Sequence, residues 1–248
     1  MTITLDMSCR QTPRYHYPSD LEQAIVNGPV TRMQTLLYEM SDSSAVEALV
    51  QETIELFNEH GSSPSDTINY IKSGEQEVNV LYFNPNTSLR EKQTFINGKL
   101  TLVMRCEFLP SGRAVRVDFA NGSDSLLEYY LIDGISEKGQ IDSARHFSST
   151  GILLETFKNI HKDFTRISAR NFDAQERMVY CDTVEVNEHN RPVREIIWMQ
   201  SGQKIVRDTV IHHYDSFDHY GNWRVHTVLR SGQKRSREVR SYTYNVSP

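Results

Sequence analysis

The sequence predicts an α+β protein: a short N-terminal helical segment followed by an antiparallel β-meander built from hairpin repeats. Apolar residues keep helix-like spacing up to Gly61, whereas beyond it they alternate and turn residues recur. In the C-terminal third, Ser201-Gly202-Gln203-Lys204 returns as Ser231-Gly232-Gln233-Lys234, which indicates a duplicated unit. The predicted parts are an extended lead-in over residues 1–18, a helical segment over 19–61 and a repeat β-sheet domain over 68–248.

Composition favours a thin sheet over a thick core. Hydrophobic residues make up 38% of the 248 residues, a low share that suits an open, twisted or single-layer sheet. Twelve Tyr and ten Phe are the large rings that a sheet with two partly wet faces would use. No apolar run reaches the length of a transmembrane helix.

Three short helices are predicted in the helical segment. A capping box opens at Ser19, and Pro29 suits the first turn of a second helix. Asp42-Ser43-Ser44 restarts a third helix, whose apolar stripe runs from Val46 to Phe57. Gly61-Ser62-Ser63-Pro64-Ser65 then forms the joint to the sheet domain.

Beyond the joint, turn residues separate strand-like runs at short intervals. Asn97-Gly98 and Asn121-Gly122 are the strongest hairpin signals, and the series continues to Ser231-Gly232 without a helix-length pattern. Because parallel strands need long crossovers, the expected topology is an antiparallel meander of about a dozen strands.

One unit recurs along the sheet domain: an aromatic residue, a short polar turn, usually Gly, and a new strand. It occurs at Phe108–Arg113, Phe147–Gly151, Phe172–Arg177 and Tyr214–Trp223. These motifs, above all Asp218-x-Tyr220-Gly221-Asn222-Trp223, resemble the YD-repeat (Rhs-like) β-sheet proteins, especially small uncharacterised bacterial envelope lipoproteins of that type. The resemblance implies a strand-repeat scaffold, since the chain is too short for the large toxin-enclosing cocoon of that family.

The same motif supplies the predicted turn and binding residues. Gly221 can take the positive φ of a tight turn, Asp215 and Asp218 can bond turn amides, and Asn222 completes the turn. The predicted binding face, which would contact a protein or glycan, combines cross-strand aromatics with arginines: Tyr214, Trp223, Tyr242, Tyr244, Arg237 and Arg240.

Two other functions stay open. A metal-dependent hydrolase could be centred on His212, Asp215 and His219, residue types that bind Zn²⁺ or transfer protons, although no HExxH spacing supports it. A cytoplasmic nucleic-acid-binding protein could use the basic C-terminus from Arg224 to Tyr244. Since no nucleophile elbow, P-loop or GxGxxG is present, the expectation is a non-enzymatic protein without metal or cofactor.

The cysteines bear on location. Cys106 and Cys181 lie in strand-like runs, either as free buried thiols or as one bridge. Ser8-Cys9 before the polar run Arg10–Pro13 looks like the start of a mature bacterial lipoprotein, with a lipid anchor at Cys9. If the true start lies upstream, the prediction is a cell-envelope scaffold or binding module; otherwise the protein is cytoplasmic.

Overall fold

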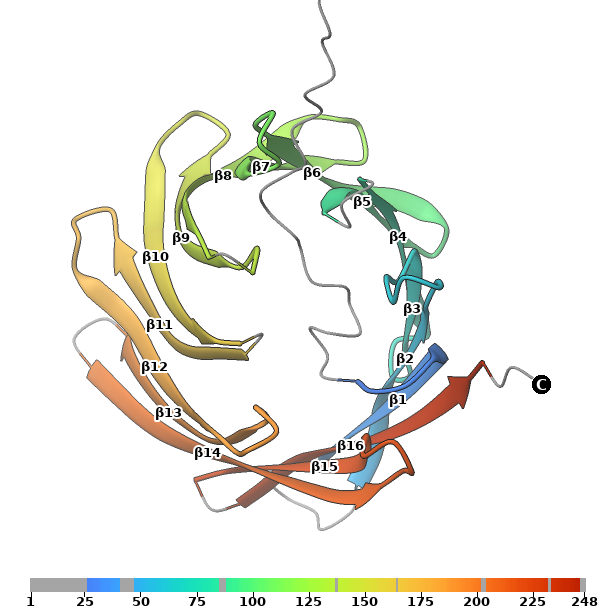
Figure 1. The fold of residues 1–248 in the computed structure, drawn as a ribbon. Coiled ribbons are helices and arrows are strands. Elements are labelled where there is room, and N and C mark those ends of the chain that lie inside the picture. The colour runs from blue at the N-terminus through green and yellow to red at the C-terminus, as the bar shows by residue number, and fades with distance from the viewer. Residues whose placement is uncertain are drawn as a thin grey trace, which may run out of the picture.

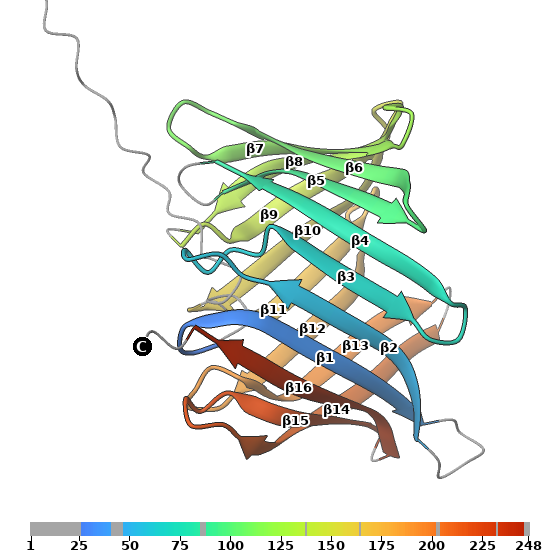
Figure 2. The same ribbon diagram turned by 90° about the vertical axis from the view of Figure 1, so that its right-hand side faces the viewer.

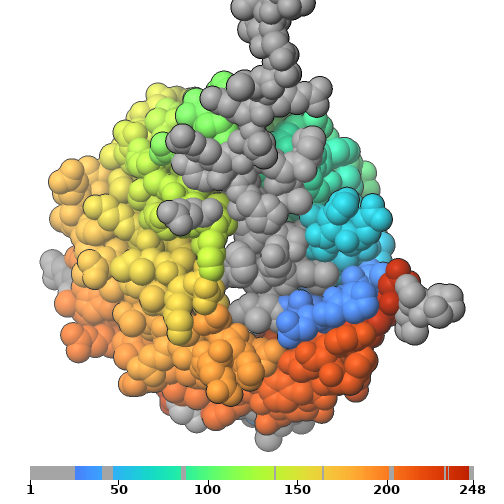
Figure 3. All heavy atoms as spheres, viewed as in Figure 1, coloured from blue at the N-terminus to red at the C-terminus, as the bar shows by residue number. Residues whose placement is uncertain are grey.

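The computed structural model describes residues 26–40, 47–84, 88–136, 138–163, 165–201, 204–231 and 233–245, which form one closed barrel (Figure 1). Within these ranges there are sixteen strands and no helix, and hence no helix that could span a membrane. Each strand pairs antiparallel with the next, and the last pairs with the first, so the described residues follow one another around a closed ring (Figure 3).

The strands are β1 (Val30–Met40), β2 (Glu47–Leu56), β3 (Ser65–Tyr70), β4 (Glu75–Phe83), β5 (Leu89–Ile96), β6 (Lys99–Phe108), β7 (Ala114–Asn121), β8 (Leu126–Ile135), β9 (Ile141–Ser148), β10 (Leu153–Lys162), β11 (Thr165–Asp173), β12 (Met178–Val186), β13 (Pro192–Ser201), β14 (Lys204–Phe217), β15 (Trp223–Arg230) and β16 (Gln233–Tyr244). They run obliquely to the barrel axis, as closure of a sheet requires (Figure 2).

The α+β prediction is wrong, because β1 and β2 occupy most of the described part of the predicted helical segment. Neither face of β2 is uniformly apolar: Gln51, Thr53 and Glu55 lie on one face, and Glu52 and Ile54 lie on the other. Without a uniformly apolar face, apolar residues lose period 2 and their spacing imitates a helix. Pairing of β2 with β1 and β3 then decides the local conformation. The predicted capping box at Ser19 and the restart at 42–44 lie outside the described residues.

The prediction of an open, twisted or single-layer sheet is also wrong. β16 pairs with β1 along nearly its whole length, with Met33 opposite Tyr242, Thr35 opposite Arg240 and Leu37 opposite Glu238. A closed barrel has no edge strand. The low apolar content fits a barrel wall around an open interior, which has no thick packed core.

Many turns of the barrel share one five-residue geometry. The first residue donates its N–H to the fifth carbonyl, accepts the fourth N–H, and its side-chain oxygen accepts the third and fifth N–H groups. The turns that show all of these bonds are Asn58–Ser62, Asn121–Ser125, Asp173–Arg177, Asn187–Arg191 and Asp218–Asn222. The fourth residue is left-handed, with φ +78° at Gly221 and +60° at Glu176, typical of a type I turn with a G1 bulge.

The β14–β15 turn fastens the barrel closed. The side chain of Asn222 accepts the Asn27 N–H at 2.7 Å and donates to the Asn27 carbonyl at 2.8 Å and the Tyr244 hydroxyl at 2.9 Å. Tyr220 lies so close to Gly28 that a Cβ there would be 2.9 Å from its ring. The predicted turn motif thus joins β14–β15 to the chain entering β1 and to the end of β16.

Candidate functional site

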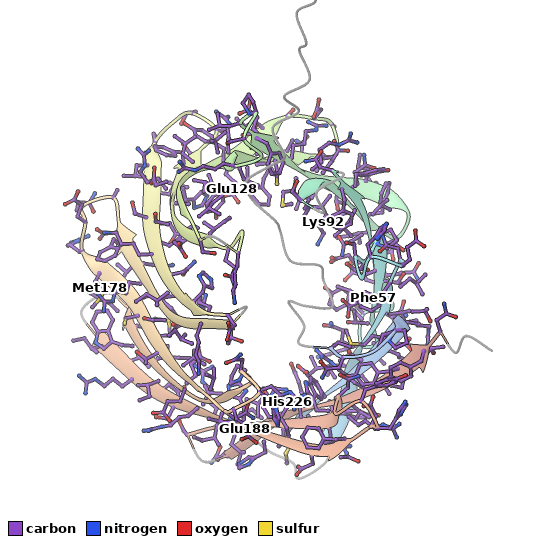
Figure 4. The ribbon with its side chains drawn as sticks, viewed as in Figure 1. Phe57, Lys92, Glu128, Met178, Glu188 and His226 are labelled. Carbon is purple, nitrogen blue, oxygen red and sulfur yellow. The ribbon has the colours of Figure 1, made fainter. Side chains whose placement is uncertain are left out.

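The inner wall of the barrel is the candidate site. Figure 4 shows Lys92, Glu128 and His226 pointing inward and Met178 pointing outward. Directly paired residues of neighbouring strands share a face, so the register assigns the rest of the wall. Each strand makes its main contacts with its two hydrogen-bonded neighbours, and the described side chains do not meet across the centre (Figure 4). A barrel of this strand number is wide enough for an aqueous interior.

A polar and aromatic group lies on the inner side of β14–β16. We call it the inner seam cluster: His212, Tyr214, Trp223, His226, Glu238 and Arg240. The Nδ1 of His212 is 3.0 Å from Nε2 of His226, whose Nδ1 is 3.3 Å from Oε2 of Glu238. The cluster therefore contains a hydrogen-bonded chain of two imidazoles and one carboxylate.

Aromatic rings pack against this chain of hydrogen bonds. Tyr214 stacks on His226 with ring centroids 4.6 Å apart and planes 7° apart, and Trp223 meets the same imidazole edge-on at 5.3 Å. The Arg240 guanidinium lies 3.9 Å from the centroid of the Trp223 ring, a cation–π contact. Tyr242 donates its hydroxyl to the Trp223 carbonyl at 2.9 Å. The cluster is thus tightly braced.

Burial sets the charge states in this cluster. It lowers the pKa of His212 below the ordinary 6.5, and nearby His226 lowers it further. Burial alone would raise the pKa of Glu238, but the hydrogen bond and charge of His226, with Arg240, hold it below 4.5. Burial raises the pKa of Tyr214 to about 12. At neutral pH the cluster therefore holds a neutral His212 and an ionised Glu238.

We expect His212 to make the protein less stable in mild acid. Because its folded pKa lies below 6.5, the unfolded chain binds a proton that the folded chain resists, so the free energy of unfolding falls as the pH drops through that value. His212→Gln removes this contribution and should flatten the decline between pH 7.5 and 5, measured by urea denaturation. His213→Gln, the next residue on the outer face, is the control. An undiminished decline in His212→Gln would contradict the assignment.

A second inward group surrounds His146 on β8–β10. Its Nε2 is 3.0 Å from Glu128 and its Nδ1 is 3.4 Å from Glu155. Tyr130 stacks on the same imidazole, with centroids 4.2 Å apart and planes 4° apart. The imidazole is thus held between two carboxylates and against one ring.

Asp182 on β12 is the most deeply buried carboxylate of the inner wall, with 0% of its surface exposed. It accepts hydrogen bonds from the Arg166 guanidinium at 2.6 Å, the Tyr180 hydroxyl at 2.9 Å and the Ala169 N–H at 2.6 Å. Burial, with the hydrogen bond to Asp182, raises the pKa of Tyr180. This carboxylate therefore joins β11 and β12 from inside the barrel.

Acidic groups dominate the inner face. Among the described residues whose pairing or alternation places them there, the carboxylates are Glu39, Glu55, Asp66, Glu75, Glu77, Glu128, Asp142, Glu155, Asp173, Asp182, Glu195, Asp208 and Glu238. The basic groups assigned to it in the same way are Lys92, Lys99, Arg166, Lys204, Arg230 and Arg240. Burial raises the pKa of both Asp66 and Glu195. The interior therefore favours a positively charged occupant.

The outer face is also charged. Ion pairs on it include Arg105–Glu91, Arg116–Asp118, Arg145–Asp133, Arg194–Glu185 and Arg237–Glu47. Large apolar side chains lie on the same face: Leu56, Ile160 and Ile196 are 47%, 55% and 39% exposed. The outer face thus mixes ion pairs with exposed apolar side chains.

The predicted binding residues divide between the two faces. Tyr214, Trp223, Tyr242, Tyr244 and Arg240 lie together on the inner side, and Trp223 is only 6% exposed. Arg237 points outward, paired with Glu47 and lying over the Tyr38 ring. The rings therefore line the interior, where the prediction had an exposed sheet face.

The hydrolase residues are not brought together. His212 faces inward, Asp215 faces outward on the same strand, and His219 lies in the following turn. The described part of the chain contains no group of three or more His, Cys, Asp or Glu residues arranged to hold a metal ion. The basic C-terminus also gives no single patch, since Arg237 and Arg240 lie on opposite faces.

Cys106 and Cys181 are both free and lie on opposite faces of distant strands. Burial raises the pKa of the Cys106 thiol to about 11, so it is not a reactive thiolate. Cys9 and its predicted lipid anchor lie outside the described residues.

Comparisons with known proteins identify no family. No family model and no curated protein matches the chain. A porin-like protein from Bacteroides uniformis has a TM-score of 0.44 at 9% identity, covering 92% of this chain and 100% of that one. A LolA superfamily protein from Nitrosomonas europaea scores 0.29 at 11% identity (92% and 93%), and a TcdB2-TccC3-Cdc42 structure scores 0.33 at 10% identity (78% and 11%). All three scores are below 0.5, so they carry no functional argument, and the YD-repeat resemblance stays a prediction.

Proposed function

We propose that the protein is a non-enzymatic binding barrel whose inner wall takes a positively charged ligand, a lysine- or arginine-rich segment of another protein. The observation that carries this proposal is the excess of carboxylates on the inner face of a hollow barrel. This moves the predicted protein contact from an outer sheet face to the interior. The envelope location remains a prediction that depends on Cys9.

Electrostatics and ring chemistry both support a cationic ligand. Carboxylates such as Asp66 and Glu195 have pKa values raised by burial, so a nearby cation would stabilise their ionised form. The Tyr130 and Tyr214 rings offer aromatic surface to ammonium or guanidinium groups. Binding should therefore weaken with added salt and with falling pH.

The test is calorimetric titration of the full chain with hexalysine, with hexaglutamate as the charge control. Glu195→Gln on the inner wall should weaken hexalysine binding several-fold. The matched variant is Glu185→Gln, which lies on the outer face and pairs with Arg194. Equal affinity in both variants, or equal binding of the two peptides, would overturn the proposal.

A further inference from the structure

A pocket separate from the inner seam cluster lies at the end of the barrel where β1 begins. It has a volume of about 420 Å³ and lies between the β12–β13 and β14–β15 turns. Its lining residues are Asn27, His189, Asn190, Arg191, Phe217, Tyr220 and Gly221. No carboxylate is among them. This pocket thus differs in charge from the acidic inner wall.

Arg191 is the notable group in this pocket. Its side chain is buried, since only 5% of the residue is exposed. It donates to the Gly221 carbonyl at 2.7 Å, while its Nε has no hydrogen-bond partner among the described residues. Its guanidinium lies 5.3 Å from the centroid of the Phe217 ring. Because arginine stays protonated, this is a buried positive charge that no carboxylate of the described chain balances.

The carboxylates around the pocket already form hydrogen bonds or ion pairs with groups other than Arg191. Asp218 bonds the amides of its own turn and the Tyr244 hydroxyl. Asp163 pairs with Lys138 and accepts from Asn190. Glu188 is exposed and lies 3.5 Å from the next residue, His189. The charge of Arg191 therefore remains available to an anion from outside.

The other side chains define the shape of that anion. Phe217 and Tyr220 are 49% and 39% exposed, which is unusual for large rings. Asn27 and Asn190 place amide groups beside them. A guanidinium fork matches a planar carboxylate, and two exposed rings match a flat apolar body. We infer that this pocket binds a small aromatic or apolar carboxylate, with its carboxylate at Arg191 and its body against Phe217 and Tyr220.

The experiment titrates the full chain separately with benzoate, benzamide and inorganic phosphate. Binding of benzoate and benzamide is monitored by saturation-transfer NMR, and phosphate is tested as a competitor of benzoate. Benzoate should bind, and benzamide, its neutral analogue, should bind at least tenfold more weakly. Arg191→Gln should weaken benzoate binding at least tenfold, whereas Arg194→Gln, an exposed arginine of the outer wall, should leave it unchanged. Phosphate binding tighter than benzoate would overturn the choice of an apolar carboxylate.

A second variant keeps the test decisive if Arg191→Gln does not fold. Phe217 is half exposed, so Phe217→Ala should fold and should weaken benzoate binding several-fold. Benzoate binding that survives both Phe217→Ala and Tyr220→Ala unchanged would overturn the inference. The pocket is separate from the inner wall, so hexalysine binding should persist in these variants.

Discussion

Replacing Asp182 by alanine is expected to lower the free energy of unfolding by about 3 kcal/mol. The substitution leaves three donors without their acceptor: the Arg166 guanidinium, the Tyr180 hydroxyl and the Ala169 N–H. Ala169 is itself only 1% exposed, so its N–H loses its acceptor at a position that is shielded from solvent in the folded protein. Guanidinium denaturation monitored by circular dichroism measures the change.

The matched control is Asp133→Ala. Asp133 accepts hydrogen bonds from the Arg145 guanidinium but lies on the outer face, where its side chain is 39% exposed. Water can solvate both partners after the substitution, so the loss should be under about 1 kcal/mol. Similar losses at the two positions would show that Asp182 is not the buried node that the structure describes.

Replacing Asn222 by alanine is expected to lower stability by about 2–3 kcal/mol and to loosen the β1–β16 pairing. The amide side chain is 1% exposed and bonds both backbone groups of Asn27 and the Tyr244 hydroxyl. These contacts hold the chain on both sides of the β1–β16 pairing, which we call the seam. Hydrogen exchange should therefore accelerate most at the Val30 end of β1 and the Tyr244 end of β16.

Ser125→Ala tests whether that effect comes from the seam. Ser125 holds the same fifth position in the β7–β8 turn, far along the chain from β1 and β16. Its substitution should change stability by less than about 0.5 kcal/mol and leave seam exchange unaltered. Faster exchange spread evenly over the barrel in Asn222→Ala would contradict the role of Asn222 at the seam.

Turn chemistry made much of the strand series predictable. Asn97-Gly98 and Asn121-Gly122 do separate consecutive strands, because their side chains and backbone freedom act locally. The duplicated unit also places equivalent residues, thirty positions apart, on equivalent faces: Tyr214 and Tyr244 face inward, and Arg207 and Arg237 face outward.

The helices and the open sheet failed because their signals depend on distant partners. Apolar residues at Met33, Leu36 and Leu37 fit a helix, yet these residues pair with β16, over two hundred positions away. Closure of the barrel leaves no signal in the local sequence. The hydrogen bonds of Asn222 to Asn27 join two segments whose sequences are typical of an ordinary loop and turn. Long-range pairing outweighs local propensity here.

The site was missed for a related reason. Glu128, His146 and Glu155 stand in three different strands, and each looks like a solvated strand residue in the sequence. Only the barrel register brings them within hydrogen-bond distance. Alternating carboxylates in successive strands were the available signal, but the sequence does not say which face of each strand points inward.

Closure of the barrel is tested most directly by measuring whether a disulfide forms between β1 and β16. Gln34 on β1 and Ser241 on β16 lie opposite one another on the outer face, a spacing that a disulfide can bridge. Gln34→Cys with Ser241→Cys, in a chain whose native cysteines are replaced by serine, should form an intramolecular disulfide in the monomer on mild oxidation. Free thiols, or disulfides only between molecules, would contradict the closed barrel and the enclosed binding wall that depends on it.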